Sequence, residues 1–416
     1  MSKKIDPRLP KGNGLSMYDG YAAVKTPWDK LINYHDAMQF VNRYKAVVGA
    51  AATQALRILI PDYTERARLL AQVAYDDKMV LFGGGMAKSF DSDLNVHPFH
   101  CGQFTGSLMG DSGDDGLLMC GRVNDFGTYR VEKELDTCPW DICGSEVCRA
   151  TTQGLQAIAE CFADLHRNGP TMDYLMVEAK GCGDRHCRIV AESREKYPAP
   201  EHERWDCFGP AVSQDLIRFT EEEDCVSEPM VFREDAGYTF SNGLCNENDD
   251  SQVYTVTAFS DAANDHIFPT INAAVDRGMF TREYADHVVH CVMEAAGKAY
   301  FGDLSTKDAI RQFLGVPRSI GDDDGRIMGG FIEVFLQAML TSYEIESFNK
   351  DEVIYLIDRY SFVAANASWH KAVIPFWYGG TKTLVNAQWS LWEETLEDTS
   401  EDMIRIKIAK KIDKFC

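Results

Sequence analysis

The sequence lacks the features that would direct it to a membrane or to nucleic acid. No apolar run approaches the roughly 20 residues of a membrane-spanning helix. The N-terminal segment MSKKIDPRLPKGNG has no apolar stretch behind its lysines, so it does not predict a signal peptide. Basic residues are also few, with 42 Lys and Arg against 64 Asp and Glu and a net charge of −22. Because phosphate backbones and anionic bilayers attract basic surfaces, we expect no nucleic-acid partner, no membrane partner and a cytoplasmic location.

Internal repeats are also absent, and the 416 residues exceed the usual size of one domain. Changes in composition and periodicity divide the chain into four segments. We expect an extended arm at 1–29, an α/β small-molecule domain at 30–200, an irregular acidic connection at 201–255 and a helical domain at 256–416.

Hydrophobic periodicity predicts the elements of these segments. Apolar residues at three- and four-residue spacing predict helices at about 35–60 and 63–79. Between roughly 117 and 192, four extended stretches surround one amphipathic helix in the order β-β-α-β-β. Beyond about 258 the pattern favours helices alone, near 259–275, 280–299, 305–314, 325–345, 350–367, 383–397 and 400–412.

The expected fold class is therefore α+β. A cysteine-rich β-β-α-β-β domain with flanking helices would be joined to an all-α C-terminal domain. The helix near 325–345 is apolar on most sides. It would form either the core of the C-terminal half or an interface, in which case the protein would be a homodimer.

Cysteine is the residue type that is plentiful, with 13 in the chain. In the absence of a secretion signal, we expect no disulfide framework. The run CPWDICGSEVC places Cys138, Cys143 and Cys148 at five-residue steps, and KGCGDRHCRIV adds Cys182 and Cys187. Three interpretations stay open. These cysteines could be small buried core residues, metal ligands with four residues between them, or nucleophiles.

A nucleophilic cysteine needs a lowered pKa, which a helix N-terminus or a neighbouring cation provides. Cys138 precedes a predicted helix, and Cys187 lies between a histidine and an arginine. The candidate catalytic residues are Cys138, Cys187, His186 and His100, with the histidines moving protons. The candidate substrate-binding residues are Arg185, Arg188, Trp140 and Glu178, with an arginine holding a carboxylate.

A second candidate site lies on the helix near 280–299. Its segment DHVVHCVME spaces histidines and acidic residues by four, so that they share a helical face. If a neighbouring helix packs against it, the two would form a cluster able to bind zinc or iron. The candidate ligands are His287, His290, Glu294, Asp265 and His266. The alternative is a solvated face with charges that pair along the helix.

The cysteine motifs also carry a resemblance. The CPW before the helix, Cys148 on the helix and GCGDRHCRI on the last hairpin resemble the 2-amino-thiazoline-4-carboxylate hydrolase-like family, over roughly residues 35–192. The same segment is similar to the four-vinyl-reductase-type hydrocarbon-binding domain. The resemblance implies an α/β domain that encloses a small cyclic or aromatic molecule. In the hydrolase family it implies hydrolytic opening of a small heterocycle, with Cys138, Cys148 and Cys187 as motif cysteines.

Three functions follow as hypotheses. The leading one is an enzyme that acts on a small cyclic or aromatic compound by hydrolysis or water addition/elimination, with a cysteine/histidine site. The second is a metal-dependent lyase or decarboxylase with a His/Asp/Glu site that holds zinc or iron. The third is a non-enzymatic small-molecule binding protein. Metal analysis separates the second from the first, and thiol alkylation separates the first from the third.

Overall fold

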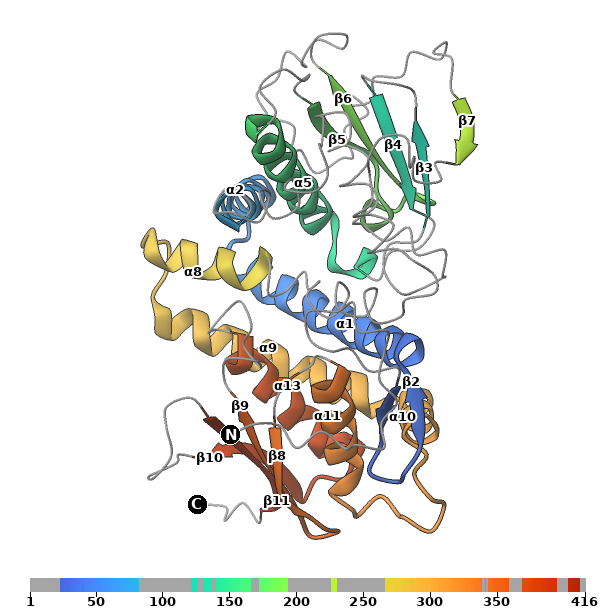
Figure 1. Cartoon of the computed structure of the whole chain (residues 1–416). Coiled ribbons are helices and arrows are strands. Elements are labelled where there is room, and N and C mark those ends of the chain that lie inside the picture. The colour runs from blue at the N-terminus through green and yellow to red at the C-terminus, as the bar shows by residue number, and fades with distance from the viewer. Residues whose placement is uncertain are drawn as a thin grey trace.

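The computed structural model describes the chain at residues 23–81, 121–125, 130–135, 140–165, 172–193, 226–229, 266–338, 341, 343–358, 369–394 and 403–411. In these residues, helices are combined with three antiparallel sheets of two, four and five strands. The fold is therefore mixed α+β (Figure 1).

The first elements are a short hairpin and two helices. Strands β1 (Ala23–Lys25) and β2 (Leu31–Asn33) pair antiparallel and lead into helix α1 (Tyr34–Leu59). Pro61 separates α1 from helix α2 (Tyr63–Leu81), since proline cannot continue a helical hydrogen-bond ladder. The helices predicted near 35–60 and 63–79 are confirmed.

A five-stranded antiparallel sheet follows, with the strand order β5-β6-β4-β3-β7. Helix α5 (Ser145–Leu165) packs against α2 and β5. Single turns of 3-10 helix, η2 (Asp141–Cys143) and η3 (Lys180–Cys182), lie before α5 and after β5. The elements from β3 to β6 occur in the expected order β-β-α-β-β. The strands are β3 (Gly121–Asp125), β4 (Arg130–Leu135), β5 (Met172–Glu178), β6 (Cys187–Ser193) and β7 (Val226–Pro229).

The C-terminal part contains helices and a sheet. The helices are α8 (Phe268–Asp276), α9 (Arg282–Gly302), α10 (Leu304–Leu314), α11 (Arg326–Ala338) and α13 (Trp369–Leu384). Side chains of Thr281 and Asp303 accept hydrogen bonds from backbone N–H groups and cap α9 and α10. All residues of α11 from Ile327 to Ala338 are buried, so this helix supplies core.

The C-terminal part is not all-α as expected, because it contains a four-stranded antiparallel sheet with the order β10-β11-β9-β8. The prediction of helices near 350–367, 383–397 and 400–412 is wrong, since strands β9, β10 and β11 lie in these three ranges. In β11, Ile404, Ile406 and Ile408 are fully buried, while the residues between them are partly exposed. This is the period of two of a strand with one buried face. The strands are β8 (Tyr343–Phe348), β9 (Glu352–Asp358), β10 (Trp389–Glu394) and β11 (Met403–Lys410).

Helix α1 lies between the five-stranded sheet and the C-terminal elements (Figure 1). On one side, the buried Tyr44 ring makes edge contacts with Phe331, Phe335 and Phe376. On the other side, the Cys143 thiol of η2 lies 3.5 Å from the carbonyl oxygen of Ala46. One continuous apolar core runs through α1. The division of the chain at 200 and 256 stays a prediction.

Among the described residues, no helix is both long enough and apolar enough to cross a membrane.

Candidate functional site

The closed end of the β5–β6 hairpin gathers most of the described residues that the sequence singled out. Residues 179–186 connect the two strands, and Gly183 takes a left-handed conformation with φ of 98°, which glycine adopts at little cost. The turn η3 packs here against η2 and the beginning of α5. We call the hairpin site the group Asp141, Glu178, Lys180, Cys182, Arg185, His186 and Arg188.

Glu178 holds an imidazole and a guanidinium on the same carboxylate oxygen. Its Oε2 atom lies 2.8 Å from Nε2 of His186 and 3.2 Å from Nε of Arg188. The Glu178 and His186 side chains are 30% and 34% exposed, so they are accessible to a small molecule. The Glu178 Oε2 atom itself is buried and makes no hydrogen bond within the described residues, so both contacts are ion-pair contacts. An imidazole beside a carboxylate is a pair of groups that can exchange protons.

The remaining polar groups shape the turn around this pair. The backbone N–H of Ala179 donates to Asp184 Oδ2 at 2.8 Å, and Lys180 Nζ lies 3.9 Å from Asp141 Oδ2. Arg185 is exposed at the end of the turn. Trp140, proposed as a substrate-binding residue, is 7% exposed and belongs to the apolar core.

The cysteines near the hairpin site are mostly packed. Cys187 is 3% exposed, and its Sγ accepts a hydrogen bond from the backbone N–H of Lys180 at 3.2 Å. Burial raises the pKa of the Cys187 thiol above its ordinary value, which is the direction opposite to that of an activated nucleophile. Cys148 lies against Gly181, where an added Cβ would come within 2.7 Å of its Sγ. These contacts favour the core interpretation for Cys143, Cys148 and Cys187.

Of the motif cysteines that the structure describes, Cys182 is the one that is partly accessible, and it was not chosen as a site residue from the sequence. Burial raises the pKa of its thiol, and the positive charge of Arg149 opposes this effect only in part. The hydroxyl of Tyr63 and Ser145 Oγ lie nearby, 2.7 Å apart. The spacing of Cys182 and Cys187 could have indicated it, because Cys182 ends η3 and Cys187 begins β6.

A buried ion cluster lies beneath the start of α5. The Glu146 carboxylate is 0% exposed; its Oε1 lies 2.8 Å from Nε of Arg57 and 3.0 Å from Nε of Arg66. Burial alone would raise the pKa of Glu146, but the hydrogen bond from Arg57 and the two positive charges outweigh it and hold the pKa below its usual value. Arg66 also donates to the carbonyl oxygens of Ile60 and Pro61 at 2.7 and 3.1 Å. The cluster joins α1, α2 and α5 and so positions the hairpin site.

The proposed metal ligands that the structure describes do not converge. His287 and His290 are exposed on α9, and Nε2 of His290 lies 3.6 Å from Oε2 of Glu294. His266 is 4% exposed and faces α5, with its Nε2 3.5 Å from Thr151 Oγ1. In the part of the chain that the structure describes, no three His, Cys, Asp or Glu side chains are grouped to hold a metal ion.

Three of the proposed site residues cannot be placed. Cys138, His100 and Asp265 lie outside the described residues, and their proposed roles stay predictions.

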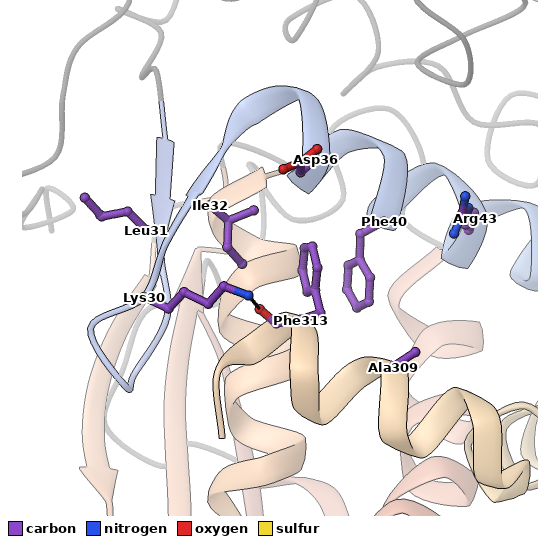
Figure 2. Close-up of a pocket in the computed structure, with 8 residues that line it drawn as sticks. All are labelled: Lys30, Leu31, Ile32, Asp36, Phe40, Arg43, Ala309 and Phe313. Atoms are coloured by element: carbon purple, nitrogen blue, oxygen red, sulfur yellow. Dashed lines mark hydrogen bonds between the residues drawn. The ribbon is translucent and has the colours of Figure 1, made fainter. Parts of the chain in front are cut away.

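An open pocket of about 340 Å³ lies elsewhere, where β2, α1 and α10 meet (Figure 2). The Phe40 and Phe313 rings stack across it with centroids 4.1 Å apart. Lys30 covers the other face of Phe313 and donates from Nζ to the carbonyl oxygens of Gln312 and Phe313 at 3.0 and 2.9 Å. Both faces of the Phe313 ring are therefore occupied, and Lys30 caps the end of α10. We interpret this pocket as a gap in the packing between α1 and α10, and we do not assign it a ligand.

Comparison with protein-family models, with curated proteins and with solved structures finds no match to this chain. The resemblance of residues 35–192 to the hydrolase-like family therefore stays a prediction.

Proposed function

We propose that this protein is an enzyme that hydrolyses a small cyclic compound at the hairpin site. The observation that supports the proposal is the contact of 2.8 Å between Nε2 of His186 and Oε2 of Glu178. It places an imidazole beside a carboxylate at a partly exposed position, and general acid–base catalysis commonly combines these two groups.

The proposed reaction uses His186 as the group that moves the proton. In this proposal the ring proton of neutral His186 sits on Nε2, the nitrogen nearest the Glu178 carboxylate, so Nδ1 would carry the free lone pair. As a water oxygen bonds to the electrophilic ring carbon of the substrate, Nδ1 takes the proton of the water. The carboxylate stabilises the imidazolium ion that forms. When the bond between the ring carbon and the leaving heteroatom breaks, the imidazolium returns the proton to that heteroatom.

The arginines of the hairpin site take different roles in this proposal. Arg188 lies 3.2 Å from the Glu178 carboxylate, so it is a positioning residue. Arg185 is exposed at the turn and would pair with a substrate carboxylate, as guanidinium groups commonly do. A small heterocycle that carries a carboxylate is the substrate class that fits, and it agrees with the resemblance.

In this proposal Cys187 has a structural role and is not the nucleophile of the thiolate hypothesis. Its buried thiol accepts a hydrogen bond from the backbone of Lys180, and it would support the turn without attacking the substrate. Water activated by His186 would therefore replace the thiolate as the nucleophile.

The test is ring opening of 2-amino-thiazoline-4-carboxylate, followed by NMR with the full chain. We expect His186→Asn to lower kcat by about 100-fold or more, the usual contribution of a positioned acid–base group, with a smaller change in KM. The matched control is His290→Asn, which alters the exposed His290–Glu294 pair on α9 and should retain full activity.

Two results would overturn the proposal. One is equal turnover by the wild-type protein and His186→Asn. The other is binding of the compound without any turnover, which would favour the non-enzymatic binding protein instead. Cys187→Ser should keep most of the activity, and a complete loss in a folded variant would restore the thiolate mechanism.

A further inference from the structure

The exposed face of α9 carries a cysteine and a histidine one helical turn apart. His287 and Cys291 are both exposed, and Cys291 is a free thiol. The Cys291 Sγ atom lies 3.8 Å from Nε2 and 4.0 Å from Nδ1 of His287. Residues four apart on a helix lie above one another on the same face, so the helix itself holds the two side chains together.

We propose that His287 and Cys291 form a two-ligand site for a zinc ion. Zinc binds cysteine sulfur at about 2.3 Å and histidine nitrogen at about 2.0–2.1 Å, in tetrahedral geometry. Those bond lengths and the tetrahedral angle place the two ligand atoms about 3.6 Å apart. The observed separation of 3.8 Å between Sγ and Nε2 is close to this value. Because Sγ is almost as close to Nδ1, a change of the His287 side-chain rotamer is needed to direct the lone pair of one nitrogen at the shared ion.

The chemistry of the pair selects the ion. Zinc forms one bond to Sγ and one to a ring nitrogen, displaces two of its water ligands and releases the thiol proton to the solvent. A thiolate with an imidazole favours zinc over magnesium or calcium, which prefer oxygen ligands. The net charge of −22 raises the local concentration of cations near the surface.

The neighbouring acidic side chains on α9 pair with other residues and do not occupy the His287–Cys291 site. Glu294 is engaged by His290 on one oxygen and by Lys298 on the other, and Asp286 pairs with Arg282 at 3.8 Å. Among the described residues no third His, Cys, Asp or Glu joins the pair. Water therefore fills the remaining coordination positions, and the bound ion exchanges with the solvent.

Protection of Cys291 from alkylation tests the proposal. The full chain would be treated briefly with iodoacetamide, with and without zinc chloride, and labelling of Cys291 would be measured by peptide mass spectrometry. Since Cys291 is exposed, we expect fast labelling without zinc. With zinc we expect labelling about tenfold slower or more, which corresponds to about 1.4 kcal/mol of protection. Reading one peptide separates this site from the other cysteines of the chain.

Two variants decide the result. In His287→Asn, zinc should no longer slow the labelling of Cys291. In His290→Asn, on the same face of α9, the protection should be kept. The ratio with and without zinc is compared within each variant, so a change in intrinsic thiol reactivity does not affect the conclusion. Labelling that zinc does not slow in the wild-type protein, or protection that survives in His287→Asn, would overturn the proposal.

Discussion

At the scale of single residues, the Glu146 carboxylate is a buried charge that depends on its two arginine partners. It is removed from water and is compensated by the guanidinium groups of Arg57 and Arg66. Removing one partner of such a buried pair leaves uncompensated charge, which costs more than an exposed ion pair contributes. This cluster therefore fixes the beginning of α5, and with it the hairpin site.

Glu146→Gln should destabilise the protein by about 3–5 kcal/mol near neutral pH, because two arginines lose their counter-charge. The folded-state pKa of Glu146 is lowered, so its contribution to stability is present above the unfolded pKa of about 4.3 and is lost as pH falls through the folded value. Urea unfolding at a series of pH values should show a shallower acid decline in the variant.

Glu65→Gln, at an exposed position on α2, is the control and should change the stability little. If Glu146→Gln unfolded at the same urea concentration as the wild-type protein, the cluster would not hold the three helices together.

Local spacing predicted part of the candidate site. Glu178 and Arg188 lie on two neighbouring strands, and His186 lies in the short turn that joins them, so the sequence alone places the three residues close together. The Glu146 cluster could not be predicted in this way, because its partners are 80 and 89 residues distant in the chain. The metal hypothesis required His266 to face α9, and the packing of α8 turned its side chain toward α5.

At the scale of elements, α9 and α13 cross with their backbones in contact. A Cβ added at Gly297 would lie 2.0 Å from the carbonyl oxygen of Phe376, and one added at Gly379 would lie 2.1 Å from that of Glu294. Only glycine allows two backbones to approach so closely. The conformational cost of glycine in a helix is offset here by the contact between the two helices.

Gly297→Ala should therefore destabilise the protein although alanine is the better helix former. We expect a loss of about 1–3 kcal/mol from the forced separation of α9 and α13, measured by urea unfolding. Gly302→Ala is the matched control on the same helix, since its added Cβ would meet nothing closer than 3.7 Å. It should be neutral or stabilising by up to about 1 kcal/mol. Equal effects of the two substitutions would contradict the close crossing.

The period of the apolar residues decides which elements could be predicted. In α1, α2 and α5 it is clear and gives the observed helices. In β11, isoleucine occupies every second position from 404 to 408, and this period of two indicated a strand that the helical interpretation overlooked. Helix α13 escaped prediction for another reason. It contains Pro375, Gly379 and Gly380, which argue against a helix locally. The two glycines are explained by close packing against α9, at Glu294 and Phe301.

At the scale of the whole molecule, distant segments meet at the buried helix α11. Gln337 exchanges hydrogen bonds with the backbone of Lys25 in β1, 312 residues away, at 3.0 and 2.7 Å. Tyr343 and Tyr355 direct their hydroxyls toward Glu333 on the same helix, and Tyr355 donates to the carbonyl oxygen of Gly329 at 2.9 Å. The N-terminal hairpin and the C-terminal sheet therefore depend on one shared polar network.

This network should make the molecule sensitive to alkaline pH. Burial, with the charge of Glu333, raises the pKa of Tyr355 well above its ordinary value. The neutral hydroxyl thus contributes stability that is fully present below the unfolded pKa of about 10 and is lost as pH rises beyond it. Tyr355→Phe should lower the free energy of unfolding by about 1 kcal/mol at pH 8, because the hydrogen bond is lost. Above about pH 10 the stability of this variant should decline less steeply than that of the wild-type protein.

Urea midpoints measured at increasing pH would test this expectation. The control is Tyr284→Phe, which changes a tyrosine that is 49% exposed on α9. The net charge of −22 makes the folded chain repel itself increasingly as further groups lose protons. This general effect acts almost equally on the wild-type protein and both variants, so a difference in slope isolates the buried hydroxyl. If Tyr355→Phe and the wild-type protein declined in parallel above pH 10, Tyr355 would ionise without cost, and the network around Glu333 would not be closed to water.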